Sequence, residues 1–173
     1  MTGLPVRRLT ALGEPEVAQL AEVLVDCVEG GASVSFMLPL SLQRAAMFWQ
    51  GLAEDVAAGR RILLVADDAE GIVGTVQVVL AQPENQPHRA DIAKMLVHRR
   101  ARRKGVGAAL VRAAEDAARA AGKTLLVLDT ATGSDAERLY VRQGWQRAGT
   151  VPDYALWPQG GLCSTTFYFR QLA

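Results

Sequence analysis

A strand, a basic glycine-containing loop, a helix and a second strand follow one another between residues 91 and 130, and this order restricts the fold most. Residues 91–97 and 124–130 have the apolar, β-branched character of strands. Residues 106–121 repeat apolar side chains at helical spacing, and Gly122 follows as a stop. The order predicts a right-handed βαβ unit with two parallel strands.

Patterns in the rest of the chain predict further helices and strands around this unit. Apolar residues recur at helical spacing from Val17 to Gly30-Gly31, and again between residues 42 and 56, where Ser41 is expected to cap the helix. Ser134 and Glu137 form a capping-box pattern before a short helix that reaches about Gln143. The other predicted strands are residues 6–10, 61–66, 72–81, 145–151 and 164–170. The expected fold is a mixed sheet flanked by helices, of the α/β (α+β) class.

Composition excludes several classes of function. No repeat or linker interrupts the 173 residues, so we expect a single domain over residues 1–173. The net charge of +1 gives no overall attraction to nucleic acid or an anionic membrane. Short apolar runs and the absence of an apolar N-terminal core predict a cytoplasmic protein. Cys27, Cys163 and the two histidines have no metal-ligand spacing; the two cysteines are expected to be buried thiols, although spacing does not exclude a disulfide.

The basic loop has the composition of a phosphate-binding site. Arg102, Arg103 and Lys104 precede Gly105 and Gly107 at the predicted helix start, where free N–H groups and the helix dipole favour an anion. The loop is neither a Walker A motif nor a Rossmann fingerprint, whose last glycine is replaced by a leucine. No aromatic residues accompany the cations, which disfavours nucleic acid. A solvated basic loop is the remaining alternative.

Two motifs identify the chain as similar to the GCN5-related N-acetyltransferases (GNAT). Arg102-x-x-Gly105-x-Gly107-Ala108 resembles the coenzyme-A signature Q/R-x-x-G-x-G/A, and residues 136–145 resemble the segment A-x-x-L-Y-x-x-x-G-F, with Trp145 in place of Phe. The resemblance implies the GNAT fold, a mixed, mostly antiparallel sheet of six to seven strands flanked by four helices. It also implies acetyl-CoA as co-substrate and no metal. Residues 30–37, 89–97 and 151–154 look like the tabtoxin-resistance branch, whose members acetylate a toxin amine.

The resemblance also implies how the cofactor is held. Backbone groups of three strand residues would pair with the pantetheine arm, one N–H near Leu96 would stabilise the oxyanion, and the loop would bind the pyrophosphate. Simple core packing is the alternative for the strand residues. The expected cofactor contacts are Met95, Leu96, Val97, Arg102, Arg103, Lys104, Gly105, Val106, Gly107 and Ala108.

Three side chains are candidates for the chemistry. The resemblance implies that Tyr140 is the general acid for the leaving thiolate; otherwise it is an aromatic anchor on its helix. Asp91 occupies the place of a glutamate base in related enzymes, and Asp129 ends a strand. Either could take the amine proton or bind the ammonium form, or Asp129 could cap a turn and Asp91 could be a surface charge.

The acceptor pocket is expected at Gly31, Ala32, Ser33 and Phe36, with the loop at residues 154–161 on its other side. Nearby acidic residues would favour a cationic or zwitterionic acceptor, and those expected there are Glu29, Glu84, Asp91 and Asp129. The favoured function is N-acetylation of a primary amine on a small molecule, an amino-acid-like toxin or metabolite. Peptide or protein N-terminal acetylation, a non-catalytic coenzyme-A sensor and a nucleic-acid module are the alternatives. A homodimer is expected through the last two strands, both placed at a sheet edge.

Overall fold

A computed structural model describes residues 3–81 and 83–173, and its central feature is a seven-stranded sheet. The strand order is β1-β2-β3-β4-β5-β7-β6, and all neighbours are antiparallel except β4 and β5, which are parallel. The fold class implied by the two motifs is therefore confirmed. The strands are β1 (Val6–Leu9), β2 (Arg61–Asp68), β3 (Gly71–Leu80), β4 (Arg89–Val97), β5 (Leu125–Ala131), β6 (Gln146–Leu156) and β7 (Leu162–Gln171). The helices are α1 (Glu14–Glu29), α2 (Leu42–Gln50), α3 (Ala53–Ala57), α4 (Val106–Ala120) and α5 (Asp135–Arg142), with a 3₁₀ turn η1 (Arg99–Ala101).

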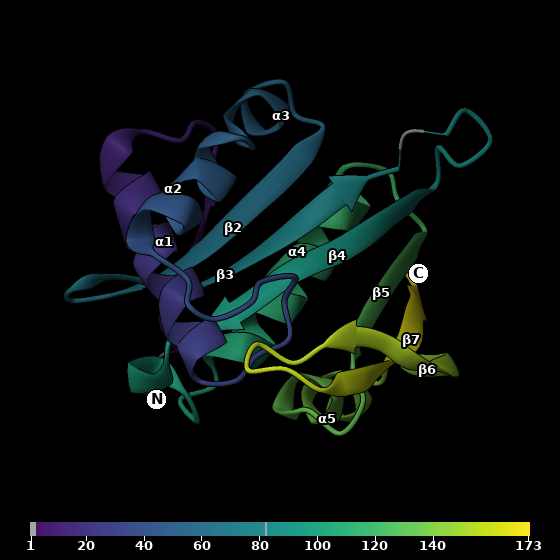
Figure 1. The fold of residues 1–173 in the computed structure, drawn as a ribbon. Coiled ribbons are helices and arrows are strands. Elements are labelled where there is room, and N and C mark those ends of the chain that lie inside the picture. Colours follow the sequence, from purple (N-terminus) through teal and green to yellow (C-terminus); the bar gives the residue numbers. More distant parts are fainter. Residues whose placement is uncertain (1–2, 82) are drawn as a thin grey trace.

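The sheet has a helical layer on each face. Helices α1 and α2 cover one face of β2–β4, and α4 lies behind the same strands on the other face (Figure 1). Leu20, Leu24 and Trp49 form the core of the first layer, and Leu110 packs into the core of the second. Burial of these apolar side chains supplies the main force that holds both layers to the sheet.

One predicted helix is two helices in the structure. The sequence pattern over residues 42–56 predicts one continuous helix, but α2 ends at Gln50 and α3 begins at Ala53. The Leu52 N–H donates to the Trp49 carbonyl at 3.0 Å and closes a tight turn over residues 49–52, which contains Gly51. Glycine is a poor helix former, so the break falls where the helix is weakest. The Ser41 cap of α2 is present as predicted, since its side chain accepts from the Arg44 N–H.

The last hairpin is longer than expected. Strand β6 continues to Leu156, past the predicted end at Val151. A register shift between Val151 and Ala155 leaves Pro152 outside the regular ladder, so its missing N–H breaks no pair. The expectation that the last two strands both lie at the sheet edge is wrong for β7, which is inserted between β5 and β6.

The parallel strands β4 and β5 separate partway along their length, and this positions the site. They pair only from Arg89↔Leu125 to Asp91↔Val127 and then diverge, as Figure 1 shows. Strand β4 also bulges, because its register with β3 shifts between Thr75 and Gln77, and Lys94 adopts a left-handed φ of 49°. The separation opens the middle of the sheet next to the start of α4.

Within the described residues, no helix is long and apolar enough to span a membrane. Cys27 and Cys163 are both buried and free, as predicted.

Candidate active site

The start of α4 presents a row of backbone donors. Ala109 is the first helix residue whose N–H finds an acceptor, the Gly105 carbonyl at 3.0 Å. The N–H groups of residues 103–108 have no hydrogen-bond acceptor among the described residues. Arg103 and Gly105 adopt left-handed φ angles of 61° and 78°, which turn the chain sharply into the helix. Such a helix start with free N–H groups is a site for a phosphate or another anion.

Only part of the basic cluster is free to reach an anion. Arg99 binds Asp26 through its backbone N–H and its Nε, and Arg100 binds Asp68. Arg102 lies back against β4, where its Nε donates to the Val97 carbonyl at 3.2 Å. Arg103 and Lys104 are exposed and form no hydrogen bond or ion pair with any described residue. These two cations are the ones available beside the free N–H groups.

The start of α4 packs closely against α5 and β4. A Cβ atom added to Gly107 would lie 2.9 Å from Leu139 Cδ2, 3.9 Å from Val97 Cγ2 and 4.0 Å from Met95 Sδ. Glycine at this position therefore allows a close approach that a larger residue would prevent. Beyond Asp91, no residue of β4 pairs with β5. The edge of β4 at Met95, Leu96 and Val97 thus lacks a partner strand, although the Val97 carbonyl already accepts from Cys27 Sγ and Arg102.

These features fit acetyl-CoA. Unpaired N–H groups and two unpaired cations match a pyrophosphate, and an unpartnered strand edge matches an extended amide-containing chain. Gly107 lets the start of α4 lie close to β4 and α5.

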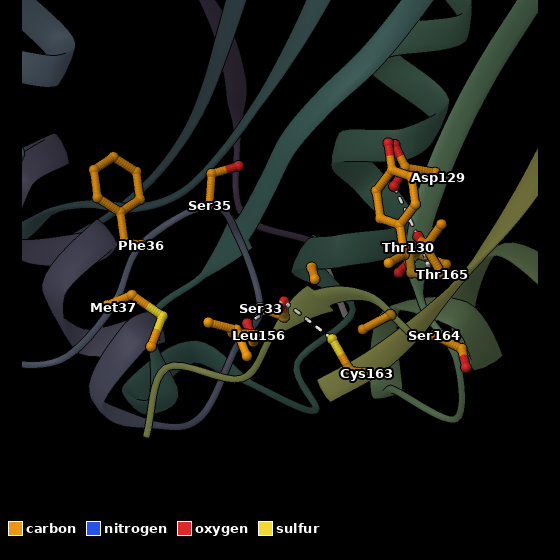
Figure 2. Close-up of a pocket in the computed structure, with 13 residues that line it drawn as sticks. Ser33, Ser35, Phe36, Met37, Asp129, Thr130, Leu156, Cys163, Ser164 and Thr165 are labelled. Atoms are coloured by element: carbon orange, nitrogen blue, oxygen red, sulfur yellow. Dashed lines mark hydrogen bonds between the residues drawn. The ribbon is translucent and has the colours of Figure 1, made fainter. Parts of the chain in front are cut away.

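A second hollow lies on the other side of the gap, between the segment after α1 and the last hairpin. Its volume is about 300 Å³. Figure 2 shows Ser35, Phe36 and Met37 on one side and Asp129, Thr130 and Thr165 on the other. The lining residues are Ser33, Ser35, Phe36, Met37, Asp129, Thr130, Ala131, Tyr154, Ala155, Leu156, Cys163, Ser164 and Thr165.

Two contacts join the walls of this cavity. The Leu38 N–H donates to the Pro158 carbonyl at 2.9 Å, and Ser33 Oγ donates to the Leu156 carbonyl at 3.3 Å. Ser33 Oγ also lies 3.6 Å from Cys163 Sγ. The segment after α1 is therefore bonded to the β6–β7 hairpin, and together they partly enclose the cavity.

The structure gathers some of the predicted acceptor residues and separates others. Ser33, Phe36 and Asp129 line the cavity, whereas Gly31 and Ala32 do not. Cys163 and Thr165 line it as well, but nothing in the sequence pointed to them, because their place depends on how β7 pairs with β5.

Of the four acidic residues expected near the pocket, Asp129 alone belongs to the described lining. Glu29 lies 3.8 Å from Arg99, and Glu84 lies in the connection before β4. Asp91 Oδ1 accepts from Arg89 Nη1 at 2.5 Å and does not line the cavity. Asp129 is the carboxylate that the fold places at this cavity, and its Oδ2 accepts from Thr165 Oγ1 at 2.7 Å.

Tyr140 lies beneath the wall that carries Asp129. The side chain is 4% exposed and its ring packs against Trp145, with ring centroids 5.6 Å apart. Its hydroxyl has no hydrogen-bond partner among the described residues. Burial, reinforced by the nearby negative charge of Asp129, raises the pKa of the Tyr140 hydroxyl above its ordinary value. Tyr140 therefore keeps its proton at neutral pH and has it free to donate.

Known proteins share both the sequence pattern and the fold. Residues 34–145 match the family model described as the acetyltransferase (GNAT) family. An uncharacterized N-acetyltransferase from the hisH-hisA intergenic region of Azospirillum brasilense is 29% identical over 131 residues, 75% of this chain and 76% of that one.

Solved structures share the whole architecture. The ribosomal-protein-alanine N-acetyltransferase of Brucella melitensis superposes with a TM-score of 0.79 at 20% identity, over 98% of this chain and 100% of that one. YncA of Salmonella typhimurium, solved with its cofactor acetyl-CoA, gives a TM-score of 0.79 at 17% identity, over 99% of this chain and 95% of that one.

Proposed function

Because the chain belongs to the GNAT family of acetyltransferases, we propose that it uses acetyl-CoA to acetylate the primary amine of a small molecule held in the 300 Å³ cavity. Dependence on acetyl-CoA and transfer to nitrogen come with the family. The nature of the acceptor is the proposal. The observation that carries it is the partial enclosure of the cavity by residues 33–38 and the last hairpin, which two hydrogen bonds join.

The enclosure favours a small acceptor over a protein terminus. A peptide needs a groove that is open at its end, so that the chain can leave the site. Here the Leu38–Pro158 and Ser33–Leu156 hydrogen bonds join the two walls on which such a groove would depend. The Brucella melitensis protein is named for a ribosomal-protein alanine, so acetylation of a protein is the outcome against which the proposal is tested.

The cofactor is held by the start of α4 and the free edge of β4. In this proposal the N–H groups of residues 103–108, with Arg103 and Lys104, bind the pyrophosphate. Met95 and Leu96 offer backbone groups to the pantetheine arm, and an N–H near Leu96 faces the developing oxyanion. Bound acetyl-CoA supplies the thioester whose acetyl group is transferred.

Asp129 acts on the acceptor amine, and Tyr140 acts on the leaving thiolate. Asp129 lines the acceptor cavity, so it either binds the ammonium form of the acceptor or takes its proton, directly or through water. Tyr140 donates its proton to the leaving thiolate, for which its hydroxyl is available because it is protonated and has no partner among the described residues. Asp91, paired with Arg89 outside the cavity lining, has no direct part in this scheme.

An amino-acid-like toxin or metabolite is the proposed kind of acceptor. The resemblance of residues 30–37 and 151–154 to the tabtoxin-resistance branch supports it, and so does a lining that combines hydroxyls, one carboxylate and aromatic rings. A small molecule with an amine at one end and polar groups at the other would match those side chains.

A competition experiment tests the proposal. The enzyme is given acetyl-CoA and an equimolar mixture of amino acids, amino-acid-like amines, polyamines and short peptides, and the acetylated products are identified by mass spectrometry. We expect the small amines to be acetylated and the peptide N-termini to remain free. Acetylated peptides with unmodified small amines would contradict the proposal.

A further inference from the structure

Lys94 is a half-buried cation next to Ser35, a residue of the cavity wall opposite Asp129. It occupies the β4 bulge, and its Nζ donates to Ser35 Oγ at 3.2 Å and lies 5.8 Å from the centre of the Phe48 ring. Ser35 and Asp129 face each other across the cavity in Figure 2. Lys94 forms no ion pair with any residue in the described ranges.

A second cation stands behind Lys94 on the same face of the sheet. Arg61 Nη1 donates to Gln77 Oε1 at 2.5 Å, and Gln77 pairs across the β3–β4 ladder with Ala93, the neighbour of Lys94. Arg61 Nη2 is 3.9 Å from an Asp55 oxygen, and Arg61 Nε is buried without a partner. Gln77 is fully buried, and its Nε2 also lacks a partner. The Arg61 guanidinium therefore has a fixed orientation, and its positive charge is only weakly neutralised.

The region around Lys94 has more positive charge than its neighbours neutralise. Burial lowers the pKa of Lys94; Asp129 opposes this effect and Arg61 adds to it, so both charges lie within electrostatic range of the ammonium. Withdrawal of a cation from water is unfavourable unless an anion accompanies it. An anion beside Lys94 would relieve both the desolvation and the repulsion from Arg61.

We propose that Lys94, supported by the positive charge of Arg61, binds a carboxylate of the acceptor while the acceptor amine lies toward Asp129. The acceptor is then a zwitterion of the amino-acid type, with its two charges placed on opposite walls of one cavity. This inference rests on the proposed function and deepens it, since it identifies which group of the acceptor distinguishes a substrate from other small amines. Lys94 is in this view a residue that determines specificity.

The test compares a carboxylate acceptor with its neutral carboxamide. The best α-amino acid acceptor and its amide are assayed by thiol release from acetyl-CoA, and kcat/KM is measured for both with the wild-type enzyme, Lys94→Met and Lys94→Arg. Lys123→Met is the matched control: it removes another half-buried lysine, which lies beyond α4, donates to the Pro87 carbonyl at 2.6 Å and is outside the cavity lining. The pKa of the amine also differs between the two acceptors. The readout is therefore the change that each mutation makes in the ratio of kcat/KM for the carboxylate to kcat/KM for the amide.

We expect Lys94→Met to lower kcat/KM about ten- to hundredfold for the carboxylate, through KM, and less than about threefold for the amide, as loss of a charge-assisted contact implies. Lys94→Arg should keep most of the preference for the carboxylate, and Lys123→Met all of it. An unchanged ratio in Lys94→Met, or an equal loss for both acceptors, would overturn the inference. If small amines react whether or not they carry a carboxylate, only this inference fails; if peptides alone react, the proposed function fails and the inference with it.

Discussion

Replacement of Tyr140 by Phe removes one hydroxyl and leaves the packing in place. The ring keeps its contact with Trp145, and the hydroxyl has no described partner to leave unpaired. The free energy of unfolding should therefore change by less than about 0.5 kcal/mol, and the melting temperature by less than about 2 °C. Loss of the proton donor should lower kcat at least about a hundredfold, which corresponds to about 2.7 kcal/mol of transition-state stabilisation.

The matched control is Tyr168→Phe, the same change at another buried tyrosine. The Tyr168 hydroxyl donates to Glu137 Oε1 at 2.8 Å, outside the cavity lining. Its loss should cost about 1 kcal/mol, or roughly 2 to 4 °C in melting temperature, with kcat unchanged. The two variants should thus show opposite patterns in calorimetry and in the thiol-release assay.

The pH dependence follows from the direction of the shift. Because burial raises the pKa of Tyr140, the neutral form that can donate a proton persists past its ordinary value of about 10. The plot of kcat against pH for the wild-type enzyme should therefore show no fall in activity from ionisation of Tyr140 below about pH 10.

A Tyr140→Phe enzyme with kcat within about threefold of wild type would refute the assignment of Tyr140 as the acid.

Three further predictions concern the cofactor site and the core. Arg103→Ala combined with Lys104→Ala should weaken acetyl-CoA binding at least about tenfold in calorimetric titration, with an unchanged melting temperature, because both side chains are exposed and unpaired. Burial raises the pKa of Cys27 to about 11, so about one thiol in a thousand is ionised at pH 8, and a thiol reagent should modify Cys27 readily only after unfolding in urea. Trp145→Phe removes the donor to buried Glu115 and should cost about 1 to 3 kcal/mol in urea denaturation without changing kcat.

The sequence predicted correctly those features of the fold that depend on residues close together along the chain. Helix α1 ends at Glu29, capped by Gly30 and followed by Gly31 with a φ of 94°, as the glycine pair predicted. Ser134 accepts from the Glu137 N–H at the start of α5, as the capping pattern predicted. The parallel pairing of β4 with β5 follows from the strand-helix-strand order.

Features that depend on distant segments could not be predicted in this way. The break at Gly51 and Leu52 reflects a small difference in helix propensity within a continuous apolar stripe, and the stripe alone does not reveal it. The cavity joins residues 33–37 to β5 and to a hairpin more than a hundred positions later, so Thr165 and Cys163 carry no local signal. The same holds for Lys94, whose position at a bulge depends on the register between β3 and β4.

The most direct test of the central claim is to fill the cavity and leave the cofactor site intact. Ser33→Trp places a large side chain between the two bonded walls, away from the start of α4. Acetyl-CoA binding by calorimetry and acceptor-dependent thiol release are measured on the same wild-type and variant samples. The variant should bind acetyl-CoA as the wild type does and lose acetylation of small amines. Unchanged turnover in the filled cavity, or a wild-type protein that does not bind acetyl-CoA, would contradict the central claim.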